Sequence, residues 1–169
     1  MKLLKEIEKI FNLYLATYYS LPIENQSWLY KNKFEQSISN QEMFNEFEQE
    51  YFDNEEITPN LMTRKYNKEQ FEEVLDLFFF GGIRNGGYNS VEKRMLTISD
   101  NYANKNYSKK ITQLIFNELN IDECIVFHEK YTLDDYEHRA IAINDLDSIG
   151  IRLDIEDKSY LMVFDWRWD

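Results

Sequence analysis

The spacing of the apolar residues changes once along this chain, near residue 121, and this change limits the folds open to it. Before that point apolar side chains recur every three or four residues, which is typical of helices with one buried face. From Cys124 onward they alternate with polar residues, which is typical of half-buried strands. The order predicts an α+β fold, with N-terminal helices over about 1–120 packed on a C-terminal antiparallel sheet of about four strands over about 121–169. A length of 169 residues fits one domain over 1–169.

Helix breakers and caps divide the chain into expected elements. Pro22 ends the first helix, and Asn40 can cap the third. The expected helices are 3–19, about 24–38, 40–52, about 67–80 and 108–119, with a loop over 53–67. The expected strands are 123–129, 136–143, 149–155 and 160–168. In the third strand Ile149, Ile151 and Leu153 share one face, whereas Arg152 and Asp154 take the other.

The stretch "GGIRNGG", residues 81–87, holds four of the five glycines of the chain. It lacks the lysine and hydroxyl of a P-loop, and it follows a helix where a dinucleotide-binding loop would follow a strand. We expect Gly81 and Gly82 to end a helix in the left-handed conformation, and Asn85, Gly86 and Gly87 to form a turn. The alternative is an anion site made by Arg84 and exposed backbone N–H groups.

The charge of the chain is strongly one-sided, with 31 acidic against 19 basic residues and a formal net charge of −12. Affinity for DNA and RNA comes largely from Lys and Arg that displace counterions from phosphates. This composition therefore disfavours direct binding of nucleic acid. The same field attracts basic proteins and speeds their association.

Residues 34–63 concentrate this acidity, because they contain eight acidic residues, five Phe or Tyr residues and no Lys or Arg. Carboxylates interleaved with aromatic rings suit a protein interface, where rings supply buried area and carboxylates pair with Arg and Lys. The alternative is a solvated face above a core. The predicted partner-binding residues are Glu42, Glu46, Glu48, Glu50, Tyr51, Phe52, Asp53, Glu55 and Glu56. A second acidic cluster comprises Asp134, Asp135, Glu137, Asp145 and Asp147.

Three residues offer candidate chemistry for an enzyme. His128 and His138, expected on adjacent strands, can act as general acid and base, or bind a metal together with a carboxylate. Cys124 can serve as a nucleophile, although at the start of an apolar strand a free cysteine is typically a small buried hydrophobe. Neither set forms a motif, so we expect no catalytic site, no metal site and no cofactor.

The C-terminal "FDWRWD" extends the apolar face of the last strand through Trp166 and Trp168. We expect these rings to pack against the helices. Exposed, they would instead mark a contact surface, as in a subunit of a larger assembly.

The cysteine count and the first residues indicate the compartment. A single cysteine excludes an intramolecular disulfide and a cysteine metal cluster, which favours a reducing compartment. The start "MKLLKEIEKIF" carries charges where an export signal has an apolar run, and no apolar stretch approaches a membrane span. We therefore expect a cytoplasmic protein without membrane contact.

Small size, acidity and an α+β layout without a catalytic motif resemble the immunity proteins of bacterial polymorphic-toxin and contact-dependent inhibition systems. The likeness extends over the whole chain but only in composition and layout, without a shared motif, so no residue role is transferred. It implies a protein that binds a cognate toxin, often a basic nuclease, and blocks its active site or substrate surface. Phage inhibitors of CRISPR or restriction nucleases are similar for the same electrostatic reason. The alternative from another class is a small hydrolase or nuclease that uses His128 and His138.

Overall fold

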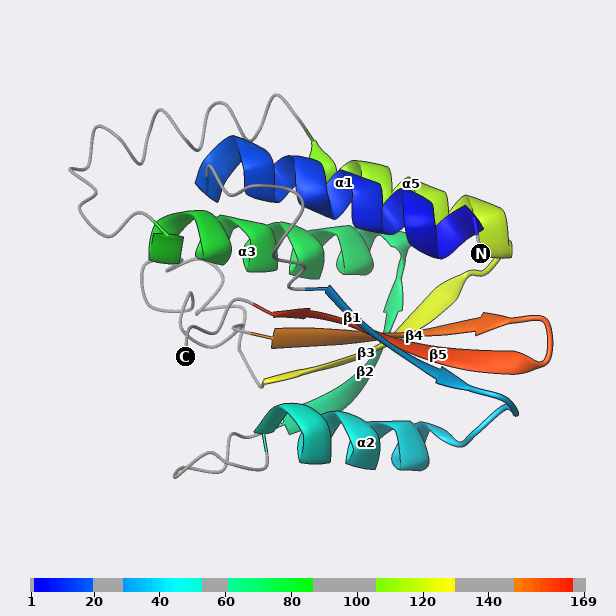
Figure 1. The fold of residues 1–169 in the computed structure, drawn as a ribbon. Coiled ribbons are helices and arrows are strands. Elements are labelled where there is room, and N and C mark those ends of the chain that lie inside the picture. Colours follow the sequence, from blue (N-terminus) through cyan, green and yellow to red (C-terminus); the bar gives the residue numbers. More distant parts are fainter. Residues whose placement is uncertain (1, 20–28, 53–60, 87–105, 130–147, 166–169) are drawn as a thin grey trace.

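The computed structural model of this chain describes residues 2–19, 29–52, 61–86, 106–129 and 148–165 (Figure 1). Within these residues the chain has an α+β fold, as the change of apolar spacing predicts. No helix among them combines the length and the apolar character needed to cross a membrane.

The centre of the fold is an antiparallel sheet of five strands in the order β1-β5-β4-β3-β2. Strands β3 (Glu123–Glu129), β4 (Ser148–Ile155) and β5 (Lys158–Asp165) form a meander in its middle. Strands β1 (Leu29–Phe34) and β2 (Leu61–Asn67) come from the N-terminal half and form its two edges. The sheet formed by the described residues therefore has five strands and not about four, and only its central part is C-terminal.

Helices cover both faces of this sheet unequally. α1 (Lys2–Tyr19), α3 (Lys68–Gly86) and α5 (Tyr107–Leu119) lie on one face (Figure 1). On the other face, α2 (Asn40–Phe52) is the only helix that the described residues form. Because α2 follows β1 and precedes β2, it crosses the sheet from one edge strand to the other.

The larger core lies between the sheet and the three helices. Alternation along the strands sends Ile149 and Ile151 of β4 and Phe164 of β5 into it, as their spacing predicts. The ring of Phe164 lies 4.9 Å from that of Phe11 on α1 and 6.1 Å from that of Phe79 on α3. Edge-to-face aromatic packing thus joins the two longest described helices to the sheet.

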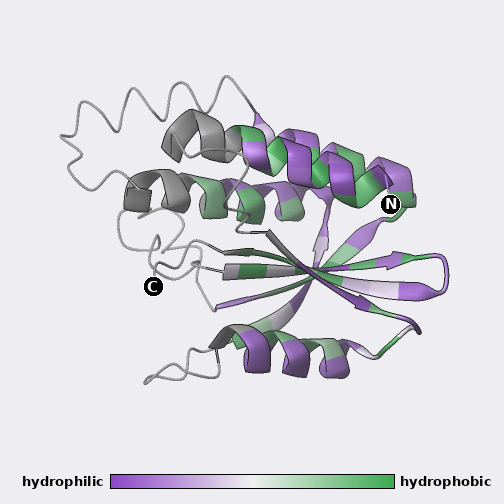
Figure 2. Cartoon of the chain, viewed as in Figure 1, coloured by the Kyte–Doolittle hydropathy of each residue, from purple (hydrophilic) through white to green (hydrophobic). Residues whose placement is uncertain are grey.

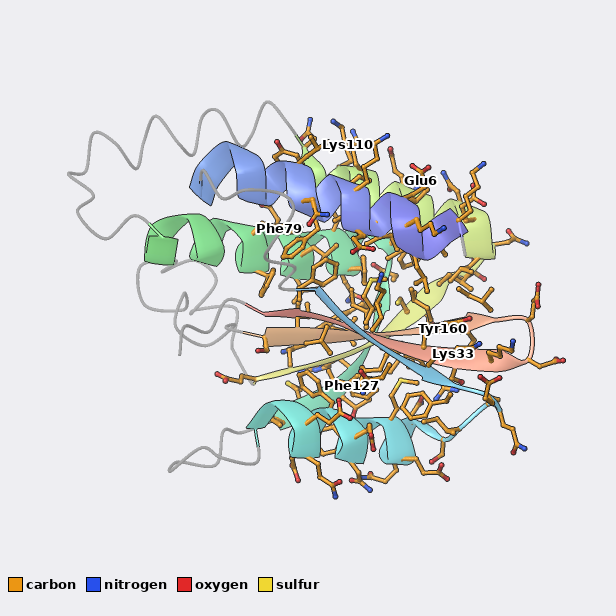
Figure 3. All side chains as sticks on the ribbon, in the orientation of Figure 1. Glu6, Lys33, Phe79, Lys110, Phe127 and Tyr160 are labelled. Carbon is orange, nitrogen blue, oxygen red and sulfur yellow. The ribbon has the colours of Figure 1, made fainter. Side chains whose placement is uncertain are left out.

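A smaller core lies under α2. Met43 and Phe47 of α2 are fully buried and pack with residues of β3 and β5, namely Phe127, Leu161 and Val163. The Phe47 and Phe127 rings lie 6.0 Å apart, and Figure 3 shows Phe127 between the sheet and α2. Hydrophilic residues follow the outer side of this helix (Figure 2). The helix is therefore amphipathic, as its sequence predicts.

Both edge strands differ from the elements that the sequence predicts. Residues 29–34, expected within a helix over 24–38, form β1 and pair with β5. Residues 61–67, expected in a loop, form β2 and pair with β3. Both strands are rich in polar residues because a strand at the edge of a sheet is partly open to solvent, and this weakens the alternation on which the prediction depends. Residues 20–28 and 53–60 lie outside the described residues.

The glycine stretch also differs from its prediction. Helix α3 does not end at Gly81 and Gly82 but continues to Gly86, so Asn85 and Gly86 are helical and not part of a turn. Glycine tolerates helical dihedrals at a cost of about 1 kcal/mol per residue, which the burial of Phe78 and Phe79 just before it can offset. Gly87 and the side chain of Arg84 lie outside the described part of the chain.

The helix caps are local and specific. At α2 the hydroxyl of Ser39, and not Asn40, accepts the N–H of Glu42 at 3.1 Å. At α3 the Asn67 side chain accepts the N–H of Gln70 at 2.9 Å, and the Gln70 side chain accepts the N–H of Asn67 at 3.0 Å. In this reciprocal capping box, Asn67 is both the last residue of β2 and the cap of α3.

The expected strand 136–143, Trp166 and Trp168 lie outside the described residues.

A methyl group added at Gly150 should destabilise the fold. An added Cβ would lie 3.0 Å from Cδ2 of Phe47 and 3.2 Å from Cδ1 of Leu161, both fully buried. We expect Gly150→Ala to lower the free energy of unfolding in urea by about 1–2 kcal/mol, because overpacking outweighs the better strand propensity of alanine. The double variant Gly150→Ala/Phe47→Leu should lose less than the sum of the single losses. Additive losses would contradict close packing at this contact.

Candidate functional site

The outer side of α2 carries the acidic residues predicted to bind a partner. Because Met43 and Phe47 face the sheet, Glu42, Glu48 and Glu50 are exposed and Glu46 is partly exposed. Of the other predicted residues, Tyr51 and Phe52 are the last two of α2, and their side chains lie outside the description. Asp53, Glu55 and Glu56, and the second acidic cluster within 134–147, also lie outside the described residues. The structure thus places Glu42, Glu46 and Glu50 one helical turn apart along one side of α2, with Glu48 on the other flank of the exposed side. These four glutamates are hereafter the acidic surface.

Glu46 and Glu50 interact one helical turn apart. Partial burial and the neighbouring Glu50 carboxylate together raise the pKa of Glu46 above its usual value. Glu50 also accepts a hydrogen bond of 2.5 Å from the amide of Asn32 on β1. This contact places the Glu46–Glu50 side of α2 toward the β1 edge of the sheet.

The position of these carboxylates along α2 is unfavourable. Glu50 lies in the last turn, which contains no basic residue to balance the partial negative charge of a helix C-terminus. Like charges at i and i+4 add a cost of a few tenths of a kcal/mol. Glu42, in the first turn, is favourably placed, but the positions of Glu46 and Glu50 are not explained by the stability of α2.

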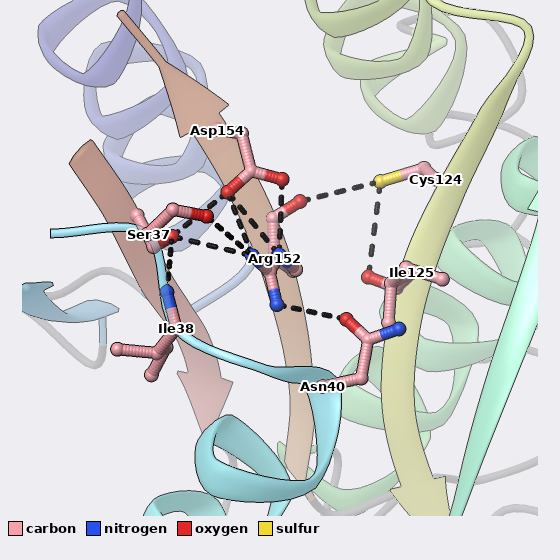
Figure 4. Close-up of polar contacts among 8 residues, drawn as sticks. Ser37, Ile38, Asn40, Cys124, Ile125, Arg152 and Asp154 are labelled. Atoms are coloured by element: carbon pink, nitrogen blue, oxygen red, sulfur yellow. Dashed lines mark hydrogen bonds and ion pairs between the residues drawn. The ribbon is translucent and has the colours of Figure 1, made fainter. Parts of the chain in front are cut away.

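A largely buried arginine side chain fixes the other end of α2. The side chain of Arg152 on β4 is only 9% exposed, and its Nε lies 2.9 Å from Oδ2 of Asp154. One terminal nitrogen donates to Oδ1 of Asn40 at 2.8 Å (Figure 4). The other terminal nitrogen donates to Ser159 Oγ at 3.3 Å. Charge-assisted bonds of this kind are about twice as strong as neutral ones. They hold the first residue of α2 to the central strand.

Sequence reasoning missed this role of Arg152. The sequence feature that could have indicated it is the pair Arg152 and Asp154, which lie two residues apart on one face of a strand. Their shared face was predicted, but the helix that covers Arg152 comes from a segment more than one hundred residues earlier.

A groove of about 510 Å³ lies next to the Arg152 cluster, lined by residues that include Asn40, Lys65, Ile125 and Arg152.

His128 is buried and contacts Tyr66. The Tyr66 hydroxyl lies 2.7 Å from Nε2 of His128, and Nδ1 contacts the backbone oxygen of Glu129. Nδ1–H therefore donates to Glu129 and Nε2 accepts from Tyr66. In the sheet, Ile149 of β4 and Met62 of β2 lie opposite His128. His138 and the expected strand 136–143 lie outside the described residues, so the predicted histidine pair stays a prediction.

The ionisation states of His128 and Cys124 follow from burial. Loss of hydration lowers the pKa of His128 from 6.5 to about 4, with the nearby Arg64 acting in the same direction. Burial, with the nearby Asp154, raises the pKa of the Cys124 thiol from 9.0 to about 12. At neutral pH the imidazole is uncharged and the thiol is protonated. Among the described residues no three His, Cys, Asp or Glu side chains come together as metal ligands.

Comparisons with protein-family models, with curated proteins and with solved structures find no match to this chain. The functional argument therefore depends on the residues themselves.

The buried imidazole of His128 should make stability sensitive to mild acid. Its pKa is lower in the folded than in the unfolded chain, so its contribution is complete above pH 6.5 and is lost as the pH falls toward 4. The pKa difference corresponds to a loss of about 3 kcal/mol. The free energy of unfolding would be measured in urea at a series of pH values for the protein and for His128→Gln, whose side chain can still accept a hydrogen bond from Tyr66. Plotted against pH, the two free energies should converge between pH 6.5 and 4. Parallel plots would contradict the lowered pKa of His128.

Proposed function

We propose that this protein binds a basic partner protein through the acidic surface and inhibits it, as an immunity protein inhibits its cognate toxin. The supporting observation is the arrangement of Glu46, Glu48 and Glu50 in the second half of α2, where no basic residue offsets them. Cationic side chains of a partner would relieve both the i, i+4 repulsion and the unfavourable charge at the helix end. Binding would thus recover a cost that the free protein bears.

The support beneath the acidic surface suits rigid recognition. Met43 and Phe47 are locked in the smaller core, and Arg152 holds the first residue of the helix. A preorganised helix loses less conformational entropy on binding than a flexible segment. The carboxylates are consequently offered at fixed spacing, which favours a particular pattern of Arg and Lys.

The proposed class of partner follows from charge. A protein with a basic surface, such as a nuclease that binds phosphates, matches the net charge of −12 and the acidic surface. The same chemistry fits a phage inhibitor of a nuclease. We propose inhibition and not catalysis, since an uncharged, buried His128 is poorly placed to exchange protons with a substrate. The single buried cysteine fits a reducing compartment such as the cytoplasm.

Reversal of two charges tests the proposal. The partner would be captured from the source cells on the immobilised protein and identified as a basic protein. Glu46→Lys/Glu50→Lys should weaken its binding at least tenfold, mainly through slower association, and the difference should shrink as salt rises. The matched control is Glu6→Lys/Glu118→Lys, which changes the net charge equally on exposed sites of α1 and α5. If both double variants bind alike, the acidic surface is not the contact. If this protein, once purified, catalyses the turnover of a nucleotide or ester substrate, the proposal that it acts only as an inhibitor is wrong.

Binding of that partner should also depend on pH in a way set by Glu46. Because its pKa is raised, Glu46 takes up a proton at a higher pH than an ordinary glutamate and stops attracting cations earlier on acidification. As the pH is lowered, the dissociation constant should therefore begin to increase at a pH higher than that at which an ordinary glutamate is protonated. Glu46→Gln should bind more weakly at pH 7 and lack this early rise in titration calorimetry. An unchanged pH profile in Glu46→Gln would show that Glu46 does not contact the partner.

A further inference from the structure

Strand β2 is a regular edge strand whose outer side pairs with no described strand. It pairs with β3 without a bulge from Leu61, opposite Glu129, to Asn67, opposite Glu123. Thr63, Arg64 and Lys65, in its middle, are all exposed. Alternate N–H and C=O groups of such a strand point away from the sheet and can bond an added strand.

The side chains of β2 are also less engaged than those of the other edge strand. On β1, Lys31 pairs with Glu8 at 2.7 Å and Lys33 pairs with Glu35 at 3.2 Å. On β2, Lys65 is 64% exposed and makes only a 3.9 Å contact with Glu123. No carboxylate of the described residues forms an ion pair with Arg64. Two cationic groups are therefore available along this edge.

Arg64 and Lys65 point to opposite faces of the sheet. Lys65 lies on the face of α2, where it lines the groove of about 510 Å³ together with Ile125 and Arg152. Arg64 pairs in register with Val126, which belongs to the core under the three helices, so it lies on the opposite face. An added strand would present side chains to both faces in alternation, and those on the α2 face would reach the rim of the groove.

We propose that β2 binds an extended acidic segment of a partner protein by strand addition. Two adjacent carboxylates of that segment, one on each face, would pair with Arg64 and Lys65 across the strands. A second copy of β2 fits poorly, because it would oppose Arg64 and Lys65 with the same two cations. The net charge of −12 repels an acidic segment at long range, but charges more than about 8 Å apart are screened at physiological salt. Local pairs therefore decide the affinity.

This edge is separate from the Glu46–Glu50 side of the acidic surface. The contact of Glu50 with Asn32 puts the Glu46–Glu50 side of α2 next to β1, at the opposite edge of the sheet. Strand addition at β2 thus does not depend on the proposed inhibition. The two sites have opposite charge and select different chemistry.

The experiment uses a capped peptide of about nine residues, the length of a strand, with two adjacent glutamates at the centre of a valine and threonine sequence. Backbone NMR of the full chain would follow amide shifts and hydrogen exchange. We expect saturable binding, largest shifts in 61–67, and about tenfold slower exchange at the β2 amides that point outward. Arg64→Glu/Lys65→Glu should weaken binding about tenfold. The matched control Lys109→Glu/Lys110→Glu, on exposed sites of α5, and Glu46→Lys/Glu50→Lys should bind the peptide within about twofold of the unmodified protein.

A second peptide keeps the test decisive if the Arg64→Glu/Lys65→Glu variant does not fold. N-methylation of alternate residues removes the hydrogen-bond donors of one edge without changing the charge, and methylation of the other alternate set serves as its control. One methylated form should lose binding to the unmodified protein and the other should keep it. Equal binding of both, shifts centred away from β2, equal weakening by the α5 variant, or no binding at millimolar peptide would overturn the proposal. Concentration-dependent dimers that protect the same amides would overturn it in favour of self-association.

Discussion

The packing of Phe47 against Gly150 and Phe127 is the contact on which the arrangement of the fold depends. Helix α2 links the two edge strands, so its seat on the sheet also sets where β1 and β2 can pair. A side chain at residue 150 would push the helix away from the central strand. Close approach at this one point therefore connects the smaller core, both sheet edges and the outward direction of the four glutamates.

Charge is distributed over this scaffold in a way that packing alone does not explain. The acidic surface concentrates carboxylates on a helix that has no basic residue, whereas both edge strands carry exposed lysine or arginine and no acidic residue. Cations on edge strands discourage edge-to-edge association of identical molecules. On β2, the same cations would favour carboxylates if the proposed strand addition occurs. Under both proposals, specificity would come from charges set on a rigid backbone.

Two polar side chains, Arg152 and His128, are removed from water and are stabilised by specific contacts. Arg152 is nearly buried, and the bonds to Asp154, Asn40 and Ser159 compensate its desolvation. His128 remains neutral between Tyr66 and the Glu129 carbonyl, because burial disfavours its protonated form. From the sequence, His128 was a candidate for catalysis, whereas Arg152 was only placed on the polar face of its strand. Their contacts give them structural roles.

The sequence by itself determined the elements whose side chains bury one full face. Helices α1, α2, α3 and α5 and strands β3, β4 and β5 follow from apolar spacing, because burial of a stripe or a face imposes that period. It also determined the acidic outer side of α2, since its helical period separates Met43 and Phe47 from the glutamates. Only the tertiary structure decided that 29–34 and 61–67 are strands, that α3 runs on through its glycines and that Arg152 holds α2. The edge strands depend on hydrogen bonds to β5 and β3, which lie far along the chain, and the Arg152 contacts join residues 112 positions apart. Local patterns carry no record of such distant partners.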